Sequence, residues 1–324
     1  MMSVKQSPKK AVTQPPKQPQ RCASIGECML ELSSEQGTAF GTQVLRFGGD
    51  TLNTAIYMAR QGVSVDYVTA LGDDKWSDEM LIAWQAEQVG TQYIAQVPGR
   101  VPGLYAIQTF ADGEREFSYW RNESPARELF EFNNSQTLWS QLMAFDYIYL
   151  SGITLSLYKP AVLDRLWSFC AEYKAQGGKL VFDSNYRPRN WPDAHIARQC
   201  FDKIARYCEI VLPTLDDEQL FDSTLTLEQC LAHYLGLGVK ELVIKLGSKG
   251  CLVCSEGKSI LVPTKAVAAL DTTAAGDSFN GTYLSLRMKG YSAELSATHA
   301  HQVAGAVVQF PGAIIDKTSQ PIFK

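Results

Sequence analysis

The segment DTTAAGDSFNG (271–281) has the residue types that phosphate chemistry requires. It lies where a loop enters a predicted helix, and the small residues Ala274, Ala275 and Gly276 let a ligand approach the backbone. The unpaired N–H groups in the first turn of a helix bind anions. Asp277, in that same turn, has two interpretations. It either complements the helix dipole or acts as a general base that takes a proton from a hydroxyl attacking a phosphoryl group.

A second polar segment, FGGDTLN, precedes another predicted helix. Asp50 or Thr51 could simply be the N-cap of that helix, after a turn made by Gly48 and Gly49. Alternatively, the glycine pair brings the backbone close to a polyhydroxylated ligand, and Asp50 and Asn53 bind its hydroxyl groups. These residues alone favour neither interpretation.

Two common nucleotide-binding signatures are absent from the sequence. The tripeptide Gly257-Lys258-Ser259 resembles the end of a P-loop, but Leu252 stands where that motif requires glycine. We therefore interpret the tripeptide as a hairpin turn between strands. No Gly-x-Gly-x-x-Gly motif follows the first predicted strand, which argues against a nicotinamide-dependent oxidoreductase.

Cysteines and histidines do not form a metal-binding pattern. The eight cysteines are scattered, mostly in apolar segments, which favours buried thiols in a reducing compartment. Cys251 and Cys254 form one close pair, but it lies in a strand-like run without a second pair at zinc spacing. His299 and His301 are two apart on a predicted helix and therefore point in different directions.

The polar segments need a framework that brings them together. A strand over 24–32, a helix over 51–62, a strand over 65–72 and a helix over 76–90 are predicted from hydrophobic periodicity. The alternation of strands and helices resumes at residue 145 and continues to the C-terminus. Since parallel strands need crossover segments, the pattern predicts an α/β fold with a mostly parallel sheet covered by helices on both faces.

The pattern changes over residues 91–121 to three short strands, TQYIAQV, GLYAIQTF and REFSYWR. Turn signals separate them, and Asp112-Gly113 predicts a hairpin. We expect these strands to pair antiparallel and, with a segment at about 30–47, to form a small β-sheet lid on the main domain.

Length alone is compatible with two domains or one large α/β unit, and because no linker separates two independent folds, a single domain is expected over residues 21–324. The chain has 324 residues, of which 45% are hydrophobic and 20% charged, and its formal charge is −4. Residues 1–20 hold four lysines and no acid, so the remainder carries −8. Because nucleic-acid surfaces need clustered lysine and arginine, this balance argues against a nucleic-acid partner.

Residues 1–20 are rich in Pro, Gln and Lys and are predicted to be a disordered basic tail. They lack the apolar segment that a secretory signal requires. No run of 18 apolar residues occurs in the chain, so we expect no membrane association through a spanning helix.

The two polar segments also resemble the signature segments of a known family. GGDTLNTAIYMARQG (48–62) and DTTAAGDSFNG (271–281) are similar to those of the ribokinase-like (PfkB) sugar kinases, and the resemblance extends over about 22–318. Six more segments resemble the family members that act on keto-deoxy sugar acids: GECMLEL, PGLYAIQ, YWRNESPAR, DSNYRP, LPTLDDE and KLGSKG. The resemblance implies a ribokinase-like fold and ATP-dependent phosphorylation of 2-keto-3-deoxy-D-gluconate at its terminal hydroxyl, giving the 6-phosphate and ADP.

The resemblance also implies roles for individual residues. Asp277 matches the catalytic base, and the anion-hole positions are Ala274, Ala275 and Gly276. The substrate-binding positions are Gly48, Gly49, Asp50, Thr51, Asn53, Tyr105, Tyr119, Arg121, Arg187 and Asp277. The ATP-binding positions are Asn185, Arg187, Lys245, Gly247, Ser248, Lys249, Gly250 and Gly276. Arginine suits a substrate carboxylate because its planar guanidinium offers paired donors.

Outside the family context, several of these residues have simpler interpretations. Tyr105 and Tyr119 could pack the lid, and Arg121 could be an exposed charge at a strand end. Arg187 and Lys249 could be solvated charges in turns.

The cofactors that the resemblance implies are ATP and Mg²⁺. Many family members carry Asn-x-x-Glu near the metal, whereas this chain has Thr214-Leu215-Asp216-Asp217-Glu218. We therefore expect no direct protein ligand to Mg²⁺; Thr214 and Asp217 act through water, and nucleotide oxygens hold the ion. A monovalent-cation site involving Asp271 is left open.

The resemblance implies a cytoplasmic protein that binds a sugar acid and ATP and forms a homo-oligomer through the lid strands. One alternative is a PfkB-family kinase for fructose, ribose or keto-deoxygalactonate, and a neutral sugar would not need Arg121. Another is a non-catalytic sugar-acid sensor on the same fold, against which the intact Asp277 argues.

Overall fold

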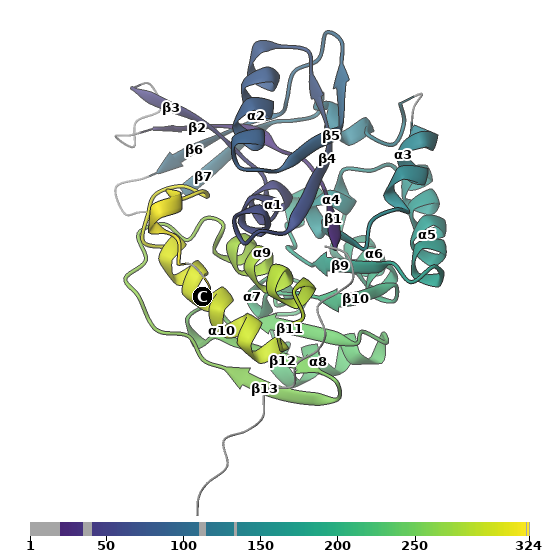
Figure 1. The fold of residues 1–324 in the computed structure, drawn as a ribbon, viewed down its shortest axis with the longest axis vertical. Helices are drawn as coiled ribbons and strands as arrows, with labels where there is room; N and C mark the ends of the chain where they lie inside the picture. The colour runs from purple at the N-terminus through teal and green to yellow at the C-terminus, as the bar shows by residue number, and fades with distance from the viewer. Residues whose placement is uncertain (1–19, 35–40, 110–114, 133–134, 322, 324) are drawn as a thin grey trace, which may run out of the picture.

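The computed structural model describes residues 20–34, 41–109, 115–132, 135–321 and 323 (Figure 1). It is an α/β fold with one large sheet, one small sheet and helices on both faces of the large sheet. Residues 1–19 of the predicted tail and the predicted Asp112-Gly113 turn lie outside the described residues.

The large sheet is mostly parallel, as the alternating pattern predicts. Its strands are, in spatial order, β13 (Lys258–Val262), β12 (Cys251–Ser255), β11 (Glu241–Lys245), β10 (Cys208–Val211), β9 (Lys179–Asp183), β8 (Tyr147–Ser151), β1 (Arg21–Ile25), β4 (Ser64–Gly72) and β5 (Gly90–Val97). The pairs from β11 to β5 are parallel, and β12 and β13 pair antiparallel at one edge. Strands such as β8 are buried along their whole length, because helices cover both faces of the sheet.

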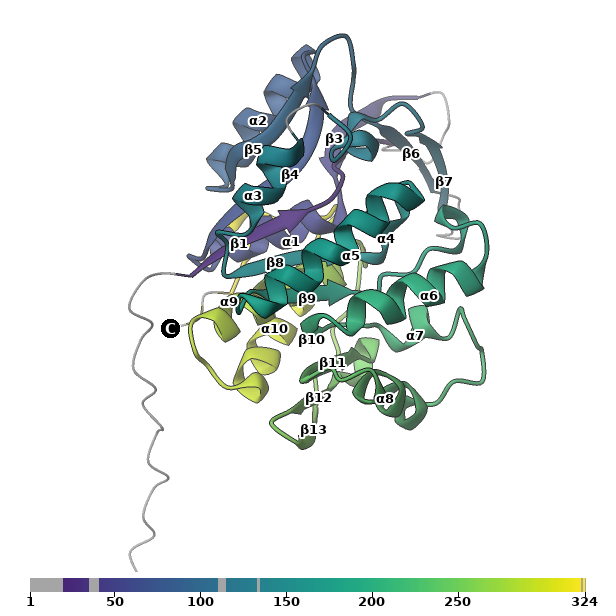
Figure 2. The same cartoon turned by 90° about the vertical axis from the view of Figure 1, so that its right-hand side faces the viewer.

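Helices cover the large sheet in two groups (Figures 1 and 2). One group packs with one face: α3 (Ser135–Leu142), α4 (Gly152–Ser156), α5 (Pro160–Ala175), α6 (Ala194–Ala205) and α8 (Leu227–Gly236). The other group packs with the opposite face: α1 (Asp50–Arg60), α2 (Lys75–Ala86), α9 (Ala275–Met288) and α10 (Ala293–Val307). The short α7 (Leu215–Glu218) follows β10.

The small sheet has the order β3 (Gln43–Gly48), β2 (Met29–Ser34), β6 (Leu104–Thr109) and β7 (Arg115–Trp120). β6 and β7 pair antiparallel, as predicted, and β2 joins them by pairing parallel with β6. In Figure 2 this sheet stands apart from the large sheet, at the upper right. It is the sheet that the sequence analysis expects to be the lid.

The expectation that TQYIAQV belongs to the small sheet is wrong. This segment forms β5, which pairs parallel with β4 at the edge of the large sheet. The crossover through α2 returns the chain in the direction that parallel pairing requires. Tyr93 and Ala95 pack against one core cluster and Ile94 against the other, so both faces of β5 are partly covered.

The predicted strand over 24–32 is two strands that belong to different sheets. β1 ends at Ile25 and β2 begins at Met29. A Cβ at Gly26 would collide with the hydroxyl of Thr51, so the chain turns at a glycine that lies against α1. This turn connects the large sheet to the small one.

The tripeptide Gly257-Lys258-Ser259 lies at a hairpin between β12 and β13, as predicted. Gly257 has a φ of 74°, a left-handed conformation that favours glycine. Cys251 and Cys254 lie on opposite faces of β12, one in each core cluster. All eight cysteines are free.

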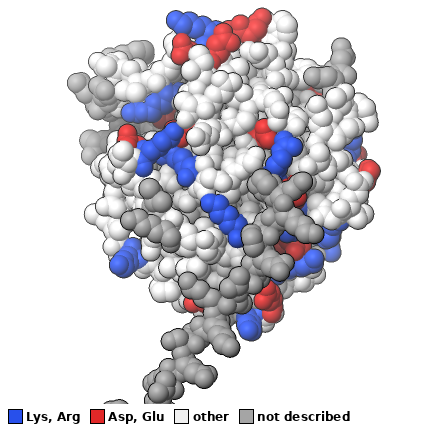
Figure 3. All heavy atoms as spheres, in the orientation of Figure 1, with Lys and Arg blue, Asp and Glu red and all other residues white. Residues whose placement is uncertain are grey.

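None of the helices in the described part of the chain is long and apolar enough to cross a membrane. On the face shown in Figure 3, basic and acidic side chains lie among many uncharged ones, without a single continuous basic surface.

Candidate active site

Polar residues gather where parallel strands of the large sheet end. Asp183 is the last residue of β9 and Lys245 the last residue of β11. The carboxyl ends of parallel strands share one edge of a sheet, which is the usual place of ligand sites in α/β folds. The N-terminal parts of α1 and α9 reach the same edge: Asn53 of α1 bonds Asp277 of α9, and Asn280 of α9 bonds Asp183.

The start of α9 has the backbone form expected of an anion-binding turn. Ala274 has a φ of 59° and a ψ of 15°, in the left-handed region that disfavours a residue with a Cβ. Backbone strain of this kind persists only where the surrounding structure holds the chain in place, and it is concentrated at functional sites. No side chain caps this helix, so the first-turn N–H groups face the predicted anion hole at Ala274, Ala275 and Gly276 without a side-chain acceptor.

The helices α1 and α9 pack closely and hold the candidate base in place. The Asn53 side-chain amide donates to Asp277 Oδ2 at 2.8 Å, and Thr54 Oγ1 donates to the Asp277 carbonyl at 3.3 Å. A Cβ at Gly281 of α9 would collide with the carbonyl oxygen of Thr54. Because glycine allows this approach, the two helix starts have a fixed relative position.

The carboxyl of Asp277 does not have an ordinary pKa. Its pKa is raised to about 8: burial is the largest cause, the charge of Asp50 acts in the same direction, and the hydrogen bond from Asn53 acts against both. A carboxyl that titrates near neutral pH is suited to take up a proton during catalysis. The charge of Asp183 also raises the pKa of Asp277, and the charge of Lys245 lowers it.

We predict that kcat/KM rises with pH through a midpoint near the pKa of Asp277, which is about 8. The base must be ionised to accept a proton, so activity is lost as pH falls below that midpoint. Asp50→Asn removes a repelling charge and should move the midpoint to lower pH, whereas Asn53→Ala removes a stabilising hydrogen bond and should move it to higher pH. Initial rates between pH 5 and 10 would measure both shifts.

The direction of the two shifts is the decisive observation, because both variants can also weaken substrate binding. Lys240→Gln serves as a control, since Lys240 is an exposed residue that pairs with Glu209. Its midpoint should equal that of the wild type. Shifts of the same sign in Asp50→Asn and Asn53→Ala would show that Asp277 does not set the profile.

A buried polar cluster lies beneath the start of α9. Lys245 Nζ donates to Asp183 Oδ1 and to Asn280 Oδ1, each at 3.2 Å. The Asn280 amide donates to Asp183 Oδ2 at 2.8 Å and to the Tyr149 hydroxyl at 3.2 Å. Lys245 was expected to contact ATP, but here its ammonium is buried and lies beneath Gly276, next to the predicted anion hole.

Asp183, Asn280 and Tyr149 were not identified from the sequence. The available signal was a charged residue at the end of an apolar strand, since KLVFD and ELVIK both end in one. Buried ions in proteins are normally paired. The acid at the end of one such strand and the lysine at the end of the other could therefore have been predicted to form an ion pair.

Asp50 and Asn185, which the sequence analysis assigns to substrate and ATP, are in direct contact. The Asn185 amide donates to Asp50 Oδ2 at 2.7 Å, and Asn185 has a left-handed φ of 29°. Burial raises the pKa of Asp50, while hydrogen bonds from Ser151 and Asn185 lower it. Thr51 is fully buried with its hydroxyl 3.2 Å from that of Tyr67, so its side chain packs the core and does not face a ligand.

The glycine pair has a structural reason that differs from the one expected. A Cβ at Gly49 would collide with the carbonyl oxygen of Glu27, and one at Gly48 would collide with the hydroxyl of Tyr105. Gly48 therefore leaves room for Tyr105 within the small sheet, and Gly49 lets the start of α1 lie against the turn between β1 and β2. Close approach of a ligand to the backbone is not needed to explain these residues.

The predicted residues of the small sheet have carboxylate partners that the sequence analysis did not name. The Tyr105 hydroxyl donates to Glu31, and the Arg121 guanidinium forms an ion pair with Glu27. The side chains of Arg121 and Glu27 are only 11% and 1% exposed, so Arg121 is not an exposed strand-end charge. Both glutamates lie in the segment GECMLEL. Two acids in a segment predicted to be a buried strand were the available signal that each needs a partner.

Arg187 and Asp217 form an ion pair at the same edge. Arg187 Nη1 donates to Asp217 Oδ1 at 2.8 Å and to the Tyr186 carbonyl at 2.7 Å. Thr214 forms an isolated bridge with Lys245, which places the Thr214-to-Asp217 segment beside the buried cluster. No group of three His, Cys, Asp or Glu side chains that could hold a metal occurs among the described residues.

The predicted nucleotide turn follows β11. Gly247 and Gly250 have φ values of 56° and 98°, which explains why both are glycines. Ser248 and Lys249 are exposed, and within the described ranges no hydrogen bond joins their side chains to the other site residues. The turn follows Lys245 directly at the carboxyl end of β11.

A cavity of about 110 Å³ lies between the small sheet and the large one. Five predicted residues line it: Gly49, Asp50, Tyr119, Arg121 and Arg187. Arg189 and Asn190, which Pro188 separates from the predicted Arg187, line it as well.

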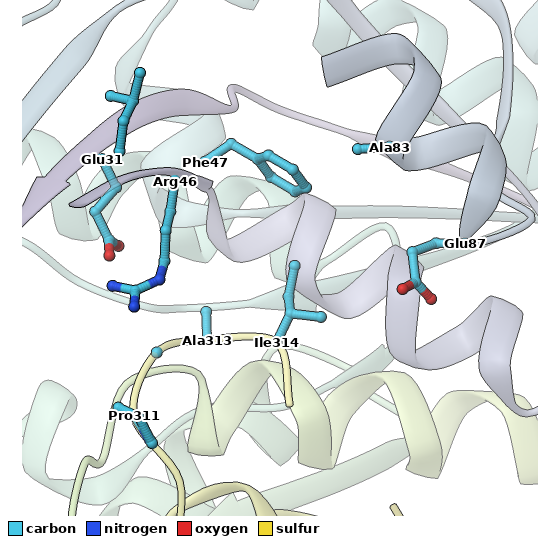
Figure 4. A pocket seen from close by; sticks show the side chains of 10 residues that line it. Glu31, Arg46, Phe47, Ala83, Glu87, Pro311, Ala313 and Ile314 are labelled. Carbon is cyan, nitrogen blue, oxygen red and sulfur yellow. The ribbon is translucent and has the colours of Figure 1, made fainter. Parts of the chain in front are cut away.

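A larger cavity of about 390 Å³ lies between β3, the end of α2 and residues 311–314. Figure 4 shows Glu31 and Arg46 pointing from the small sheet toward the loop with Pro311 and Ala313. This larger cavity is lined by none of the predicted site residues. The smaller cavity is the better candidate for a substrate site, because it is lined by Asp50, which lies three residues before the Asn53 that bonds Asp277.

An uncapped helix start, a carboxyl with a raised pKa beside it and a cavity lined by arginines fit the class of α/β phosphotransferases. Comparison with known proteins agrees with that class. The model of the pfkB family carbohydrate kinases matches residues 19–320. This chain belongs to that family and is a carbohydrate kinase.

Its relatives include two enzymes named 2-dehydro-3-deoxygluconokinase. That of Dickeya dadantii is 44% identical over 310 residues, covering 92% of this chain and 98% of the relative. That of Escherichia coli K12 is 43% identical, covering 93% and 99%. A solved 2-dehydro-3-deoxygluconokinase from Thermotoga maritima has a TM-score of 0.80 at 20% identity, covering 92% of this chain and 95% of that one. An Escherichia coli structure assigned as a ribokinase II with ATP and Mg²⁺ has a TM-score of 0.80 at 21% identity, covering 94% and 96%.

Proposed function

We propose that this chain phosphorylates 2-dehydro-3-deoxy-D-gluconate, also called 2-keto-3-deoxygluconate, at its terminal hydroxyl with ATP, giving the 6-phosphate and ADP. The relatives that are 43% to 44% identical over nearly their whole length carry the name of this activity. The observation that carries the proposal in the structure is the partly buried Asp277 at the uncapped start of α9.

In this proposal Asp277 accepts the proton of the attacking hydroxyl. The pKa of Asp277, raised to about 8, makes its carboxylate a stronger base than an exposed one. The first-turn N–H groups at Ala275 and Gly276 stabilise the charge on the phosphoryl group during transfer. Lys245, buried beneath Gly276, adds a fixed positive charge on the protein side.

The cavity between the sheets is the proposed sugar site. Several buried polar atoms near it have no hydrogen-bond partner among the described residues, including Asn53 Oδ1, Glu27 Oε1 and Arg121 Nε. Buried polar atoms are normally satisfied, so acceptors and a donor left in this state favour a ligand with several hydroxyl groups. Closure of the small sheet over the sugar would exclude water that otherwise hydrolyses ATP.

The proposed site of ATP and Mg²⁺ is the edge of the large sheet where Arg187 pairs with Asp217. Thr214 and Asp217 are the candidate residues near the ion. One oxygen of the Asp217 carboxylate, Oδ1, already accepts a hydrogen bond from Arg187. Such a sparse donor set suits Mg²⁺, which keeps several waters and binds mainly to phosphate oxygens. When bound, the ion would offset charge on the phosphates. Asn185, Arg187 and the turn from Gly247 to Gly250 are the proposed ATP contacts.

A panel of acceptors tests the proposal directly. ADP release would be measured with 2-dehydro-3-deoxygluconate, its galactonate epimer, fructose, ribose and adenosine at equal concentrations. The two sugar acids should be phosphorylated at a kcat/KM at least about 100-fold above the neutral acceptors, because only they can use a charge-assisted bond to arginine. A preference for fructose, ribose or adenosine would overturn the proposal, and no ADP release with any acceptor would favour the sensor alternative.

We further propose that the chain works in the cytoplasm and as a homo-oligomer. Eight free cysteines, seven of them buried, suit a reducing compartment. Leu45, Phe117 and Trp120 of the small sheet are exposed large apolar side chains, and β3 and β7 are edge strands. A second copy covering this sheet would protect both features. The molar mass in solution would test the assembly.

A further inference from the structure

The turn that leads into α9 is connected through Asp271 to a distant part of the chain. Ala274 in this turn has a left-handed φ of 59°, a conformation that the surrounding structure must hold. Asp271 Oδ1 accepts a hydrogen bond from the Thr273 N–H at 2.9 Å, within the turn. Its Oδ2 accepts one at 2.8 Å from the N–H of Gly312, which lies 41 residues further along the chain. The carboxylate of Asp271 therefore joins the turn to the segment after α10.

This segment, residues 308–315, contacts the turn at a second point. The Val308 carbonyl accepts hydrogen bonds from the N–H groups of Leu270 and Asp271, at 2.7 and 3.1 Å. Together with the bond from Gly312, three hydrogen bonds join residues 270 and 271 to the segment. The position of the turn at the start of α9 therefore depends on the position of this segment.

Tyr57 of α1 holds the same segment from within the core. Its hydroxyl donates to the Ala313 carbonyl at 3.0 Å and accepts from the Ile315 N–H at 3.4 Å. The side chain is fully buried and packs in one cluster with Val303, Val307 and Ile315. The pKa of Tyr57 is raised to about 12, with burial as the largest cause. The hydroxyl thus keeps its proton at neutral pH and can donate.

Arg60 adds a second contact from α1 to this segment. Its Nη1 donates to the Ile315 carbonyl at 2.8 Å, while Nε and Nη2 bond Glu87 of α2 at 2.8 and 3.0 Å. Asn53, Tyr57 and Arg60 are spaced by four and three residues, so they share one face of α1. This face contacts the candidate base through Asn53 and the segment after α10 through Tyr57 and Arg60.

We propose that Tyr57 is a positioning residue for phosphoryl transfer. By fixing residues 313–315 it fixes Asp271, and thereby the first-turn N–H groups at Ala275 and Gly276. Hydrogen-bond donors stabilise a transferring group best when they are already placed where charge develops. This inference rests on the proposed function, because it presupposes that these N–H groups face the phosphoryl group. It deepens that function by naming the buried side chain that keeps them in place.

The test compares Tyr57→Phe with the matched control Tyr173→Phe. Tyr173 of α5 is 1% exposed, and its hydroxyl also donates to a carbonyl, that of Phe145, at 2.8 Å. Each variant removes one buried hydroxyl bonded to the backbone, so both should lower the melting temperature to a similar degree. Well below that temperature, only Tyr57→Phe should change catalysis.

The expected change is a loss of kcat without a loss of binding. In Tyr57→Phe, kcat should fall about 10-fold, while the KM for the sugar and the Kd for ADP stay within about twofold of the wild type. ADP is the informative nucleotide, because it lacks the phosphoryl group that the N–H groups are proposed to stabilise. A wild-type kcat in Tyr57→Phe, or an equal loss of kcat in Tyr173→Phe, would overturn the assignment.

Amide hydrogen exchange gives a readout that does not depend on activity. Local exchange reports how often a segment opens. The peptide covering residues 271–281 should therefore exchange faster in Tyr57→Phe than in the wild type or in Tyr173→Phe. The same exchange rate in all three proteins would show that Tyr57 does not hold the turn.

A double variant tests the route through Asp271. Asp271→Ala removes the bonds from Thr273 and Gly312 together. If Tyr57 acts through Asp271, adding Tyr57→Phe to Asp271→Ala should lower kcat no further. Losses of kcat that multiply would show that the two residues act independently, and would overturn the proposed route.

Failure of this inference is distinguishable from failure of the proposed function. If the wild type phosphorylates the sugar acid and Tyr57→Phe has the kcat of Tyr173→Phe, the assignment of Tyr57 is wrong while the function stands. If the wild type prefers another acceptor, the proposed substrate is wrong, and the kcat comparison is made with that acceptor. If it releases no ADP, the function fails, and the exchange of residues 271–281 still decides whether Tyr57 holds the turn.

Discussion

Replacing Asp277 with asparagine is expected to lower kcat by about 10²- to 10⁴-fold, the usual contribution of a general base. Asparagine has the same shape, and its carbonyl oxygen can still accept the 2.8 Å hydrogen bond from Asn53. It cannot accept the hydroxyl proton. The fold, the KM for the sugar and the affinity for ATP should therefore stay close to those of the wild type, as ADP release and nucleotide titration would measure.

Asp277→Asn should also change how stability depends on pH. Folding raises the pKa of Asp277 from 3.8 to about 8, so between these values the folded chain binds more protons than the unfolded chain. The stability that Asp277 confers is therefore lost as pH rises through this range. The asparagine variant lacks this loss and should have a higher melting temperature than the wild type at pH 9.

Asp164→Asn is the matched control for both measurements, because Asp164 is an exposed residue of α5. It should retain the turnover and the pH-dependent stability of the wild type. Near-wild-type kcat in Asp277→Asn would exclude Asp277 as the base, whatever its effect on stability.

Replacing Lys245 with methionine is expected to destabilise the fold by about 3–5 kcal/mol, the usual cost of leaving a buried charge unpaired. Lys245 and Asp183 have side chains that are 9% and 3% exposed, and the ammonium also bonds Asn280. Methionine keeps the length of the side chain but leaves the Asp183 carboxylate with Asn280 as its remaining side-chain partner. Urea unfolding would measure the loss.

The double variant Lys245→Met/Asp183→Asn shows whether charge is the cause. Removing both charges should recover a large part of the stability that Lys245→Met loses. Lys240→Met is the control, because Lys240 forms an exposed pair with Glu209 and such pairs contribute about 0–1 kcal/mol. If the double variant is no more stable than Lys245→Met, the loss comes from packing and not from the unpaired charge.

Local sequence patterns were sufficient to predict most of the helices and strands that hold the site. Hydrophobic periodicity identified α1 and β4, and the turn signal at Gly257 identified the β12–β13 hairpin, because each depends on residues close in sequence. β5 was misplaced because the sheet to which an edge strand belongs is decided by a crossover and by packing against distant residues.

The site was only partly predictable for a similar reason. Asp277, Asp50 and Asn53 lie in two short segments with suitable residue types, and the structure connects them through Asn53. Glu27 and Asp183 depend on partners that are distant in sequence: Glu27 pairs with Arg121 and Asp183 with Lys245. No spacing rule brings such pairs together, so their discovery required the tertiary fold.

The close packing of α1 and α9 at Gly281 fixes one part of the candidate site, whereas the rest of the site lies in other elements. Asp277 and the helix start proposed to bind phosphate belong to α9, which is fixed against α1. Two of the residues predicted to bind the substrate, Tyr119 and Arg187, belong to the small sheet and to the loop after β9. Substitutions in that sheet and loop can therefore change which sugar is accepted while the geometry of phosphoryl transfer is inherited unchanged.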